Sequence, residues 1–181
     1  MRTRQSPTRP LPELWLVSDA RNDAGLEGAL RRLPRGSGFV YRHYHLPEAE
    51  RMARWHALLR IARARGHLAI LADSALTARE WGADGLYGAP RALYPASRLV
   101  TLATAHSLRE IGEANRVRAT AVMLSPAFPT RSHPGAKALG AVRFRLLARQ
   151  ARVPVIALGG MTARTARRLR WSRWAAIDGL S

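Results

Sequence analysis

Short apolar runs recur along this chain at nearly regular intervals, and each run ends in polar or glycine-containing residues. Runs of this kind, bounded by turn-forming residues, are typical of strands that are buried on both faces of a parallel sheet. Between most of them, apolar residues recur with helical spacing instead. The pattern predicts alternating strands and helices, with strands at residues 14–19, 39–42, 68–73, 85–87, 99–103, 121–124, 154–158 and 174–177.

The first two helical segments carry recognisable start signals. The helix after the first strand is expected to be capped by Asp23, whose carboxylate can accept a hydrogen bond from a free backbone N–H group. The next helix is expected to begin at Pro47 and to bury Met52, Trp55 and Leu59. Residues with this spacing lie on one face of a helix, and that face would cover the sheet.

Eight strands that alternate with helices predict a single α/β domain with the architecture of a (β/α)8 TIM barrel. The domain is expected at residues 13–181, after a flexible lead-in at residues 1–12. The chain has 181 residues, fewer than the roughly 250 of a usual barrel. The shorter length is expected to reflect a missing helix after the last strand. A doubly wound open sheet is the alternative architecture.

The net charge of +18 comes almost entirely from arginine, since Lys137 is the only lysine. The arginines are dispersed over helical segments without interleaved aromatic residues, so nucleic acid is not the expected partner. The chain has no cysteine, which excludes disulfides and thiolate metal sites. It also has no apolar run near the ~20 residues of a membrane span and no signal-like apolar region at its start. The sequence therefore predicts a cytoplasmic protein with no membrane partner.

The active site of a barrel forms at the C-terminal ends of its strands. The polar residues and glycines at those ends are therefore the candidates: Asp19, Arg42, Asp73, Tyr87, Thr104, His106, the loop 125–134, Gly159, Gly160 and Asp178.

Two of these candidates have competing interpretations. Arg42 is expected to clamp a phosphate group, the alternative being a salt bridge at the barrel mouth. Asp73 either belongs to the site or caps the helix that follows it. His43 and His45 form a His-x-His pair, but no matching cluster of carboxylates follows them. A surface loop is therefore expected there rather than a metal site.

Gly159 and Gly160 follow a buried apolar run, and Thr162 can cap the helix after them. Glycine permits a tight turn and a close approach to a ligand, and the helix start directs N–H groups toward the same place. This arrangement favours phosphate binding. The alternative is an ordinary strand-to-helix turn in which glycine serves geometry alone.

The sequence resembles the thiamine phosphate synthase family and its close relatives, the thiazole tautomerases (TenI-like group). The resemblance covers nearly the whole chain in order and spacing. It rests on residues 14–19, Gly82-Ala83-Asp84-Gly85, Thr104-Ala105-His106-Ser107, Pro126-Ala127-Phe128-Pro129-Thr130 and residues 154–161.

The resemblance implies an enzyme that joins a thiazole phosphate to an aminopyrimidine diphosphate, with loss of pyrophosphate and help from Mg²⁺. It implies catalytic roles for His106 and Arg42, and a metal role for Asp73. The implied substrate-binding residues are Thr104, Phe128, Thr130, Arg131, His133, Gly159 and Gly160.

The chain also departs from the family pattern. Val40 and Tyr44 stand where a glutamine and a lysine are expected, and Ala92 lies near the place of a second metal carboxylate. Arg91 or Arg131 could restore positive charge, but neither can hold Mg²⁺.

Asp178 stands beside the phosphate turn, where an ionised carboxylate would repel a phosphate unless an arginine pairs with it or it is protonated. Two alternatives to the synthase therefore remain open. One is a thiazole tautomerase with His106 as acid and base. The other is a non-catalytic paralogue that binds a phosphorylated metabolite. A homo-oligomer is compatible with the sequence.

Overall fold

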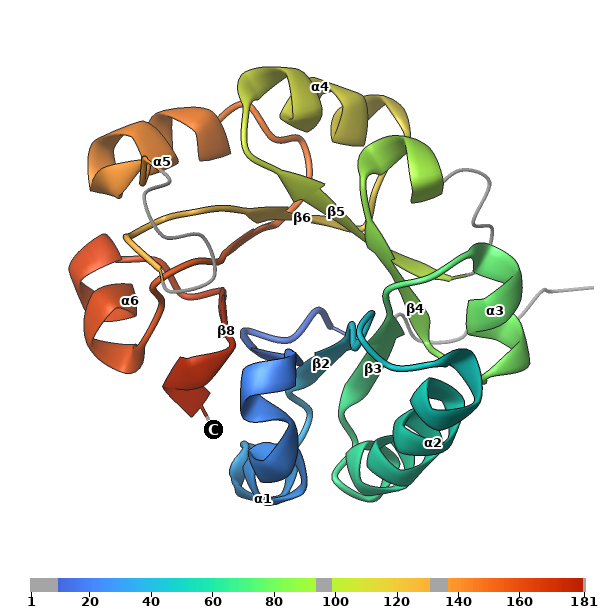
Figure 1. The fold of residues 1–181 in the computed structure, drawn as a ribbon. Helices are drawn as coiled ribbons and strands as arrows, with labels where there is room; N and C mark the ends of the chain where they lie inside the picture. The colour runs from blue at the N-terminus through green and yellow to red at the C-terminus, as the bar shows by residue number, and fades with distance from the viewer. Residues whose placement is uncertain (1–9, 94–98, 131–136, 181) are drawn as a thin grey trace, which may run out of the picture.

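The structure is a computed structural model, and it describes residues 10–93, 99–130 and 137–180. Eight parallel strands form a closed barrel in the order of the chain, and the last strand pairs with the first (Figure 1). The predicted (β/α)8 TIM barrel is confirmed, and the open sheet is wrong because an open sheet would leave two edge strands unpaired.

The strands are short and largely buried, as expected of parallel strands that are covered on both faces. They agree with the predicted runs to within about two residues, as is usual for boundaries that depend on hydrogen bonding. Their bounds are β1 (Leu14–Val17), β2 (Gly38–Tyr41), β3 (Leu68–Leu71), β4 (Gly85–Gly88), β5 (Val100–Ala105), β6 (Ala121–Leu124), β7 (Val155–Ala157) and β8 (Trp174–Ala176).

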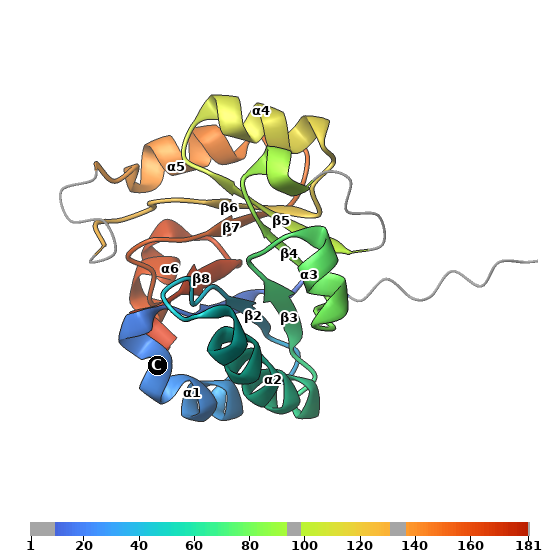
Figure 2. The same cartoon turned by 45° about the vertical axis from the view of Figure 1, so that its right-hand side comes forward.

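The α-helices lie outside the barrel (Figure 2). They are α1 (Leu26–Arg32), α2 (Glu48–Ala64), α3 (Ala75–Glu80), α4 (Leu108–Arg116), α5 (Gly140–Ala148) and α6 (Ala163–Leu169). Short 3₁₀ segments are η1 (Ala20–Gly25), η2 (Pro90–Leu93) and η3 (Asp178–Leu180). Within the described residues, η3 is the helical segment that follows β8. No helix in the described ranges is long and apolar enough to cross a membrane.

Alternating residues of each strand pack to opposite sides of the barrel wall. Trp15 and Val17 of β1 belong to the cluster that fills the interior, whereas Leu16 packs with the residues beneath the helices. The Trp15 indole lies against Gly38, where an added Cβ would come within 2.1 Å of the ring. A glycine is therefore needed at the start of β2.

Two expectations about the helices are wrong. Asp23 does not cap α1; Asp19 caps η1 instead, and the Asp23 carboxylate turns toward Arg54 of α2. Met52 is 40% exposed, whereas Arg51 is buried. Trp55 and Leu59 are buried as predicted, and Arg51 is buried in place of Met52 because its guanidinium donates to Asp73 and to the carbonyls of Ala72 and Arg42.

Candidate active site

A cavity of about 370 Å³ lies at the C-terminal ends of the strands, which is the size of a small-molecule site. Its wall is built from the ends of β2 and of β4 to β8 together with the loops that follow them. Predicted site residues in this wall are Arg42, Tyr87, His106, Thr130, Gly159, Gly160 and Asp178. Strands that are far apart in the sequence thus bring most of the candidates together.

Arg42 follows β2 and is fixed on three sides. Its backbone N–H donates to the Ser18 hydroxyl over 2.8 Å, and its carbonyl accepts from Nε of Arg51 over 3.1 Å. Its guanidinium Nη2 lies 3.5 Å from Oδ2 of Asp19. The salt bridge that the sequence leaves as an alternative is therefore present, and the guanidinium also lines the cavity.

Tyr87 of β4 lies beside Arg42 in the same wall. Burial raises the pKa of its phenol, although the nearby Arg42 acts in the opposite direction. The hydroxyl is therefore protonated near neutral pH, and it can donate a hydrogen bond to an oxygen of a bound anion.

His106 lies at the cavity rim, just after β5, and more than half of its side chain is exposed. Its backbone N–H donates to Oε2 of Glu110 over 2.6 Å, and its Nδ1 lies 3.5 Å from the same oxygen. Burial raises the pKa of Glu110, but hydrogen bonds from His106 N–H and the Ser107 hydroxyl outweigh it, so the pKa lies below its ordinary value. An ionised carboxylate therefore faces the imidazole.

Gly159 and Gly160 form the turn after β7, with φ angles of +91° and +60° that favour glycine. A Cβ on Gly160 would lie 2.4 Å from the Pro129 carbonyl oxygen, and one on Gly159 would lie 2.8 Å from Pro126. The turn thus packs closely on the loop after β6 and forms part of the cavity wall. Backbone geometry alone is enough to require both glycines.

Asp178 lines the cavity, and an arginine does pair with it. Oδ2 of Asp178 lies 3.4 Å from Nη1 of Arg21, and Nε of Arg21 lies 2.9 Å from Oδ1 of Asp19. Arg42 pairs with Oδ2, the other carboxylate oxygen of Asp19. Acidic and basic side chains therefore alternate along this edge of the mouth, which limits the repulsion that Asp178 would exert on a phosphate.

Asp73 lies outside the cavity wall and pairs with Nη1 of Arg51. The alternative in which Asp73 caps α3 is wrong, because Ser74 is the cap and accepts a hydrogen bond from Thr77 N–H. Burial raises the pKa of Asp73, but hydrogen bonds from Arg51 and from Ser74 N–H hold it below its ordinary value. In the described part of the chain, no three His, Asp or Glu side chains are grouped closely enough to hold a metal ion.

Other predicted residues lie outside the cavity wall. Thr104 is half-buried on β5, and Phe128 packs against the core beneath the glycine turn. Arg91 is 75% exposed and pairs with Glu113. Arg131 and His133 lie outside the described residues.

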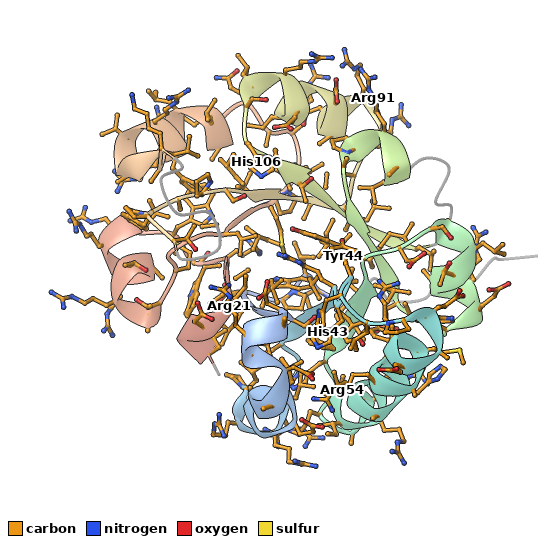
Figure 3. The ribbon with its side chains drawn as sticks, in the orientation of Figure 1. Arg21, His43, Tyr44, Arg54, Arg91 and His106 are labelled. Atoms are coloured by element: carbon orange, nitrogen blue, oxygen red, sulfur yellow. The ribbon has the colours of Figure 1, made fainter. Side chains whose placement is uncertain are left out.

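The surface loop predicted around His43 and His45 is present and His45 is exposed, but the prediction is wrong for the His43 side chain, which is buried. Its Nδ1 lies 2.8 Å from the Ser18 hydroxyl, and its Nε2 lies 2.8 Å from Oδ1 of Asp23. Figure 3 shows His43 and Arg54 on the same side of the barrel, beside α1 and α2. A polar Ser18 directly after a buried strand is the sequence signal that could have indicated this network.

The segment that surrounds the glycine turn is strongly basic. The sequence has no aspartate or glutamate from residue 114 to residue 177. This range contains β6, α5, β7, α6 and β8, which lie side by side along one part of the barrel (Figure 1). Exposed arginines of α5 and α6 include Arg143 and Arg167.

The closed barrel and the cavity at its C-terminal mouth define a (β/α)8 protein with a site of small-molecule size. Residues 14–179 match the family described as thiamine monophosphate synthase. The chain belongs to this family.

A curated relative supports the same family over a shorter stretch. It is named "Putative thiamine-phosphate synthase 2", from Aquifex aeolicus (strain VF5), and is 39% identical over 59 residues. The match covers 33% of this chain and 32% of that protein. It therefore spans about a third of the relative's length.

Solved structures show the same fold. The thiamine phosphate pyrophosphorylase from Pyrococcus furiosus has a TM-score of 0.77 at 24% identity, covering 91% of this chain and 85% of that one. The corresponding protein from Bacteroides thetaiotaomicron has a TM-score of 0.62 at 15% identity, with coverages of 91% and 82%. The YdjI aldolase from Escherichia coli K12 has a TM-score of 0.63 at 10% identity, covering 92% and 74%. Because an aldolase fits about as well as one of the pyrophosphorylases, the fold alone does not define the reaction.

Proposed function

We propose that this protein condenses a thiazole phosphate with an aminopyrimidine diphosphate, giving thiamine phosphate and releasing pyrophosphate. The observation that carries the proposal is the cavity of a thiamine monophosphate synthase family barrel in which Arg42 and the Gly159–Gly160 turn share one wall. The cavity is large enough for a small phosphorylated molecule.

Arg42 is assigned to the diphosphate. As the bond to the leaving group breaks, negative charge builds up on the departing oxygens, and a guanidinium can bind two of them at once. The hydrogen bonds from Arg42 N–H to Ser18 and from Arg51 to the Arg42 carbonyl hold its backbone before the ligand arrives. Such preorganisation avoids the cost of rearrangement during the reaction.

The thiazole phosphate is assigned to the side of the cavity formed by Gly159, Gly160 and Thr130. The Thr130 hydroxyl can donate to a phosphate oxygen. The salt bridge between Arg21 and Asp178 supports this assignment, because it offsets the one carboxylate in this part of the wall.

The test is the formation of thiamine phosphate from the two substrates, measured by mass spectrometry. Arg42→Met is expected to lower kcat/KM for the diphosphate by about 10² or more, the usual cost of losing a group that binds developing charge. Arg143→Met removes an exposed arginine of α5 and serves as the matched control, with unchanged activity.

Absence of product from folded wild-type protein would overturn the proposal. Isomerisation of a thiazole phosphate under the same conditions would then indicate the tautomerase, with His106 in reach of the cavity as its acid and base. Calorimetric binding of the thiazole phosphate without any reaction would instead indicate the non-catalytic paralogue.

A further inference from the structure

The aspartates at the mouth of the barrel are each matched by arginine. The twelve Asp and Glu side chains all lie in the ranges that the structure describes, so no aspartate at the mouth is missing from this comparison. The pairs at the mouth are Asp19 with Arg21 and Arg42, Asp23 with Arg54, Asp73 with Arg51, and Asp178 with Arg21.

Arg51 makes the most enclosed of these pairs. It comes from α2, is only 8% exposed, and all three nitrogens of its guanidinium are engaged. Nη1 pairs with the Asp73 carboxylate, Nη2 donates to the Ala72 carbonyl over 2.8 Å, and Nε donates to the Arg42 carbonyl over 3.1 Å. This one cation therefore ties the end of β3 to the segment that carries Arg42.

Aromatic rings surround the same guanidinium. Its central carbon lies 5.9 Å, 5.6 Å and 5.5 Å from the ring centroids of Tyr41, Tyr44 and Trp81. Ring faces at these distances attract a cation and exclude water from it. Arg51 is thus a permanent, desolvated positive charge that is fixed beside Asp73.

Mg²⁺ requires a nearly octahedral set of oxygen ligands, usually including one or two carboxylates that are free to bind it. At Asp73, Oδ2 faces Arg51 and Oδ1 accepts a hydrogen bond from Ser74 N–H over 2.7 Å. The other mouth aspartates are engaged by their own arginines. The donor set does not fit Mg²⁺.

We propose that the Arg51 guanidinium takes the place of a divalent cation at Asp73, so that the protein binds and converts its phosphorylated substrates without Mg²⁺. The claim that the reaction proceeds without Mg²⁺ rests on the proposed function, whereas the claim that Arg51 replaces a divalent cation at Asp73 does not. Neither Arg51 nor Asp73 lines the cavity, so the effect of this pair on the ligand passes through the position of Arg42, whose carbonyl accepts from Arg51.

The first experiment is a titration of the wild-type protein with Mn²⁺, followed by electron paramagnetic resonance. The expected result is no saturable binding at millimolar metal, and the same melting temperature in Mg²⁺ as in EDTA, because a metal that bound only the native state would raise it. Saturable binding that the Asp73→Asn variant abolishes would overturn the proposal. Neither readout depends on the reaction that the protein catalyses.

The second experiment tests the pair itself. Arg51→Met is expected to lower the melting temperature, and the added change Asp73→Asn to recover part of the loss, since it removes the carboxylate left without its cation. Arg60→Met, an exposed position on the same helix, is the control. A double variant no more stable than Arg51→Met would contradict the proposal.

If the wild-type protein forms thiamine phosphate, its rate in EDTA is expected to stay within about twofold of the rate in Mg²⁺, since no metal supplies charge stabilisation. A rate that collapses in EDTA would overturn the proposal. Absence of product under both conditions would count against the proposed function, and the Mn²⁺ titration would still decide whether Asp73 binds a metal.

Discussion

The Asp178 carboxylate lies 3.4 Å from the Arg21 guanidinium, although the two residues come from opposite ends of the chain. The closure of the barrel places them together, because β8 pairs with β1 and each residue follows one of these strands. The negative charge of Asp178 in the cavity wall is thereby offset by Arg21, which lies outside the wall. Under the proposed function, the binding of a phosphate beside Asp178 would therefore depend on a residue that does not itself line the cavity.

Arg21→Met is expected to weaken binding of a phosphorylated thiazole by about two- to threefold, the modest effect of an exposed ion pair. The loss arises because Asp178 then exerts more of its charge on the ligand. The double variant with Asp178→Asn is expected to restore affinity, and isothermal titration calorimetry measures both. Equal losses in the single and double variants would contradict this relation.

Gly160→Ala is expected to destabilise the protein by about 2–4 kcal/mol, through a left-handed backbone angle and a steric conflict together. The conflict is with the Pro129 carbonyl oxygen, 2.4 Å from an added Cβ. Gly36→Ala is the matched control, since Gly36 has a φ of +79° but no atom within 4 Å of an added Cβ. It is expected to cost only about 1 kcal/mol. Similar urea midpoints for both variants would contradict the role of packing at the turn.

His106→Asn is expected to lower kcat by about 10² if the imidazole moves a proton in the reaction, with little change in ligand affinity. Asparagine keeps a polar side chain of similar size at the α4 start. Steady-state kinetics with the two proposed substrates separate kcat from KM. An unchanged kcat would mean that His106 moves no proton in the reaction and only forms part of the cavity rim, where it contacts Glu110.

Acid is expected to lower the stability of the protein in two stages, first through His43 and then through Asp19 and Asp23. Burial lowers the pKa of His43 below its ordinary 6.5, although Asp23 acts in the opposite direction. The unfolded chain therefore binds this proton more readily, and stability is lost as the pH falls below about 6.5. At Asp19 and Asp23, burial raises the pKa of the carboxyl, but hydrogen bonds from arginines outweigh burial and hold the pKa below its ordinary value of 3.8. Further stability is therefore lost as the pH falls below 3.8.

Urea unfolding of wild type and His43→Gln at several pH values tests the first stage. The variant is expected to lose about 1–3 kcal/mol at neutral pH, because it disturbs buried hydrogen bonds. Its stability should also change less than that of wild type between pH 5 and 7. The control is His56→Gln, at an exposed position of α2. A pH dependence identical to wild type would exclude His43 as the group responsible.

The barrel could be predicted from sequence because its strands are buried on both faces, which leaves continuous apolar runs such as those of β3 and β6. The wall residues Arg42 and His106 could be found because they directly follow such runs. The role of Arg51 could not, since it depends on its contact with Asp73. For His43 the sequence offers only the polar Ser18 after β1 as a signal, and it does not identify Asp23 as the second partner. Periodicity indicates which residues are apolar, but it does not identify the partners of a buried polar side chain.

The absence of acidic residues from 114 to 177 has a kinetic consequence. The exposed arginines of α5 and α6 give this part of the barrel an excess of positive charge, and the field of such a charge accelerates the diffusional encounter with anions. Added salt screens it over a distance of about 10 Å at 0.1 M. Rising ionic strength should therefore slow the capture of a phosphorylated ligand, while its residence time, set by close contacts inside the cavity, stays nearly constant.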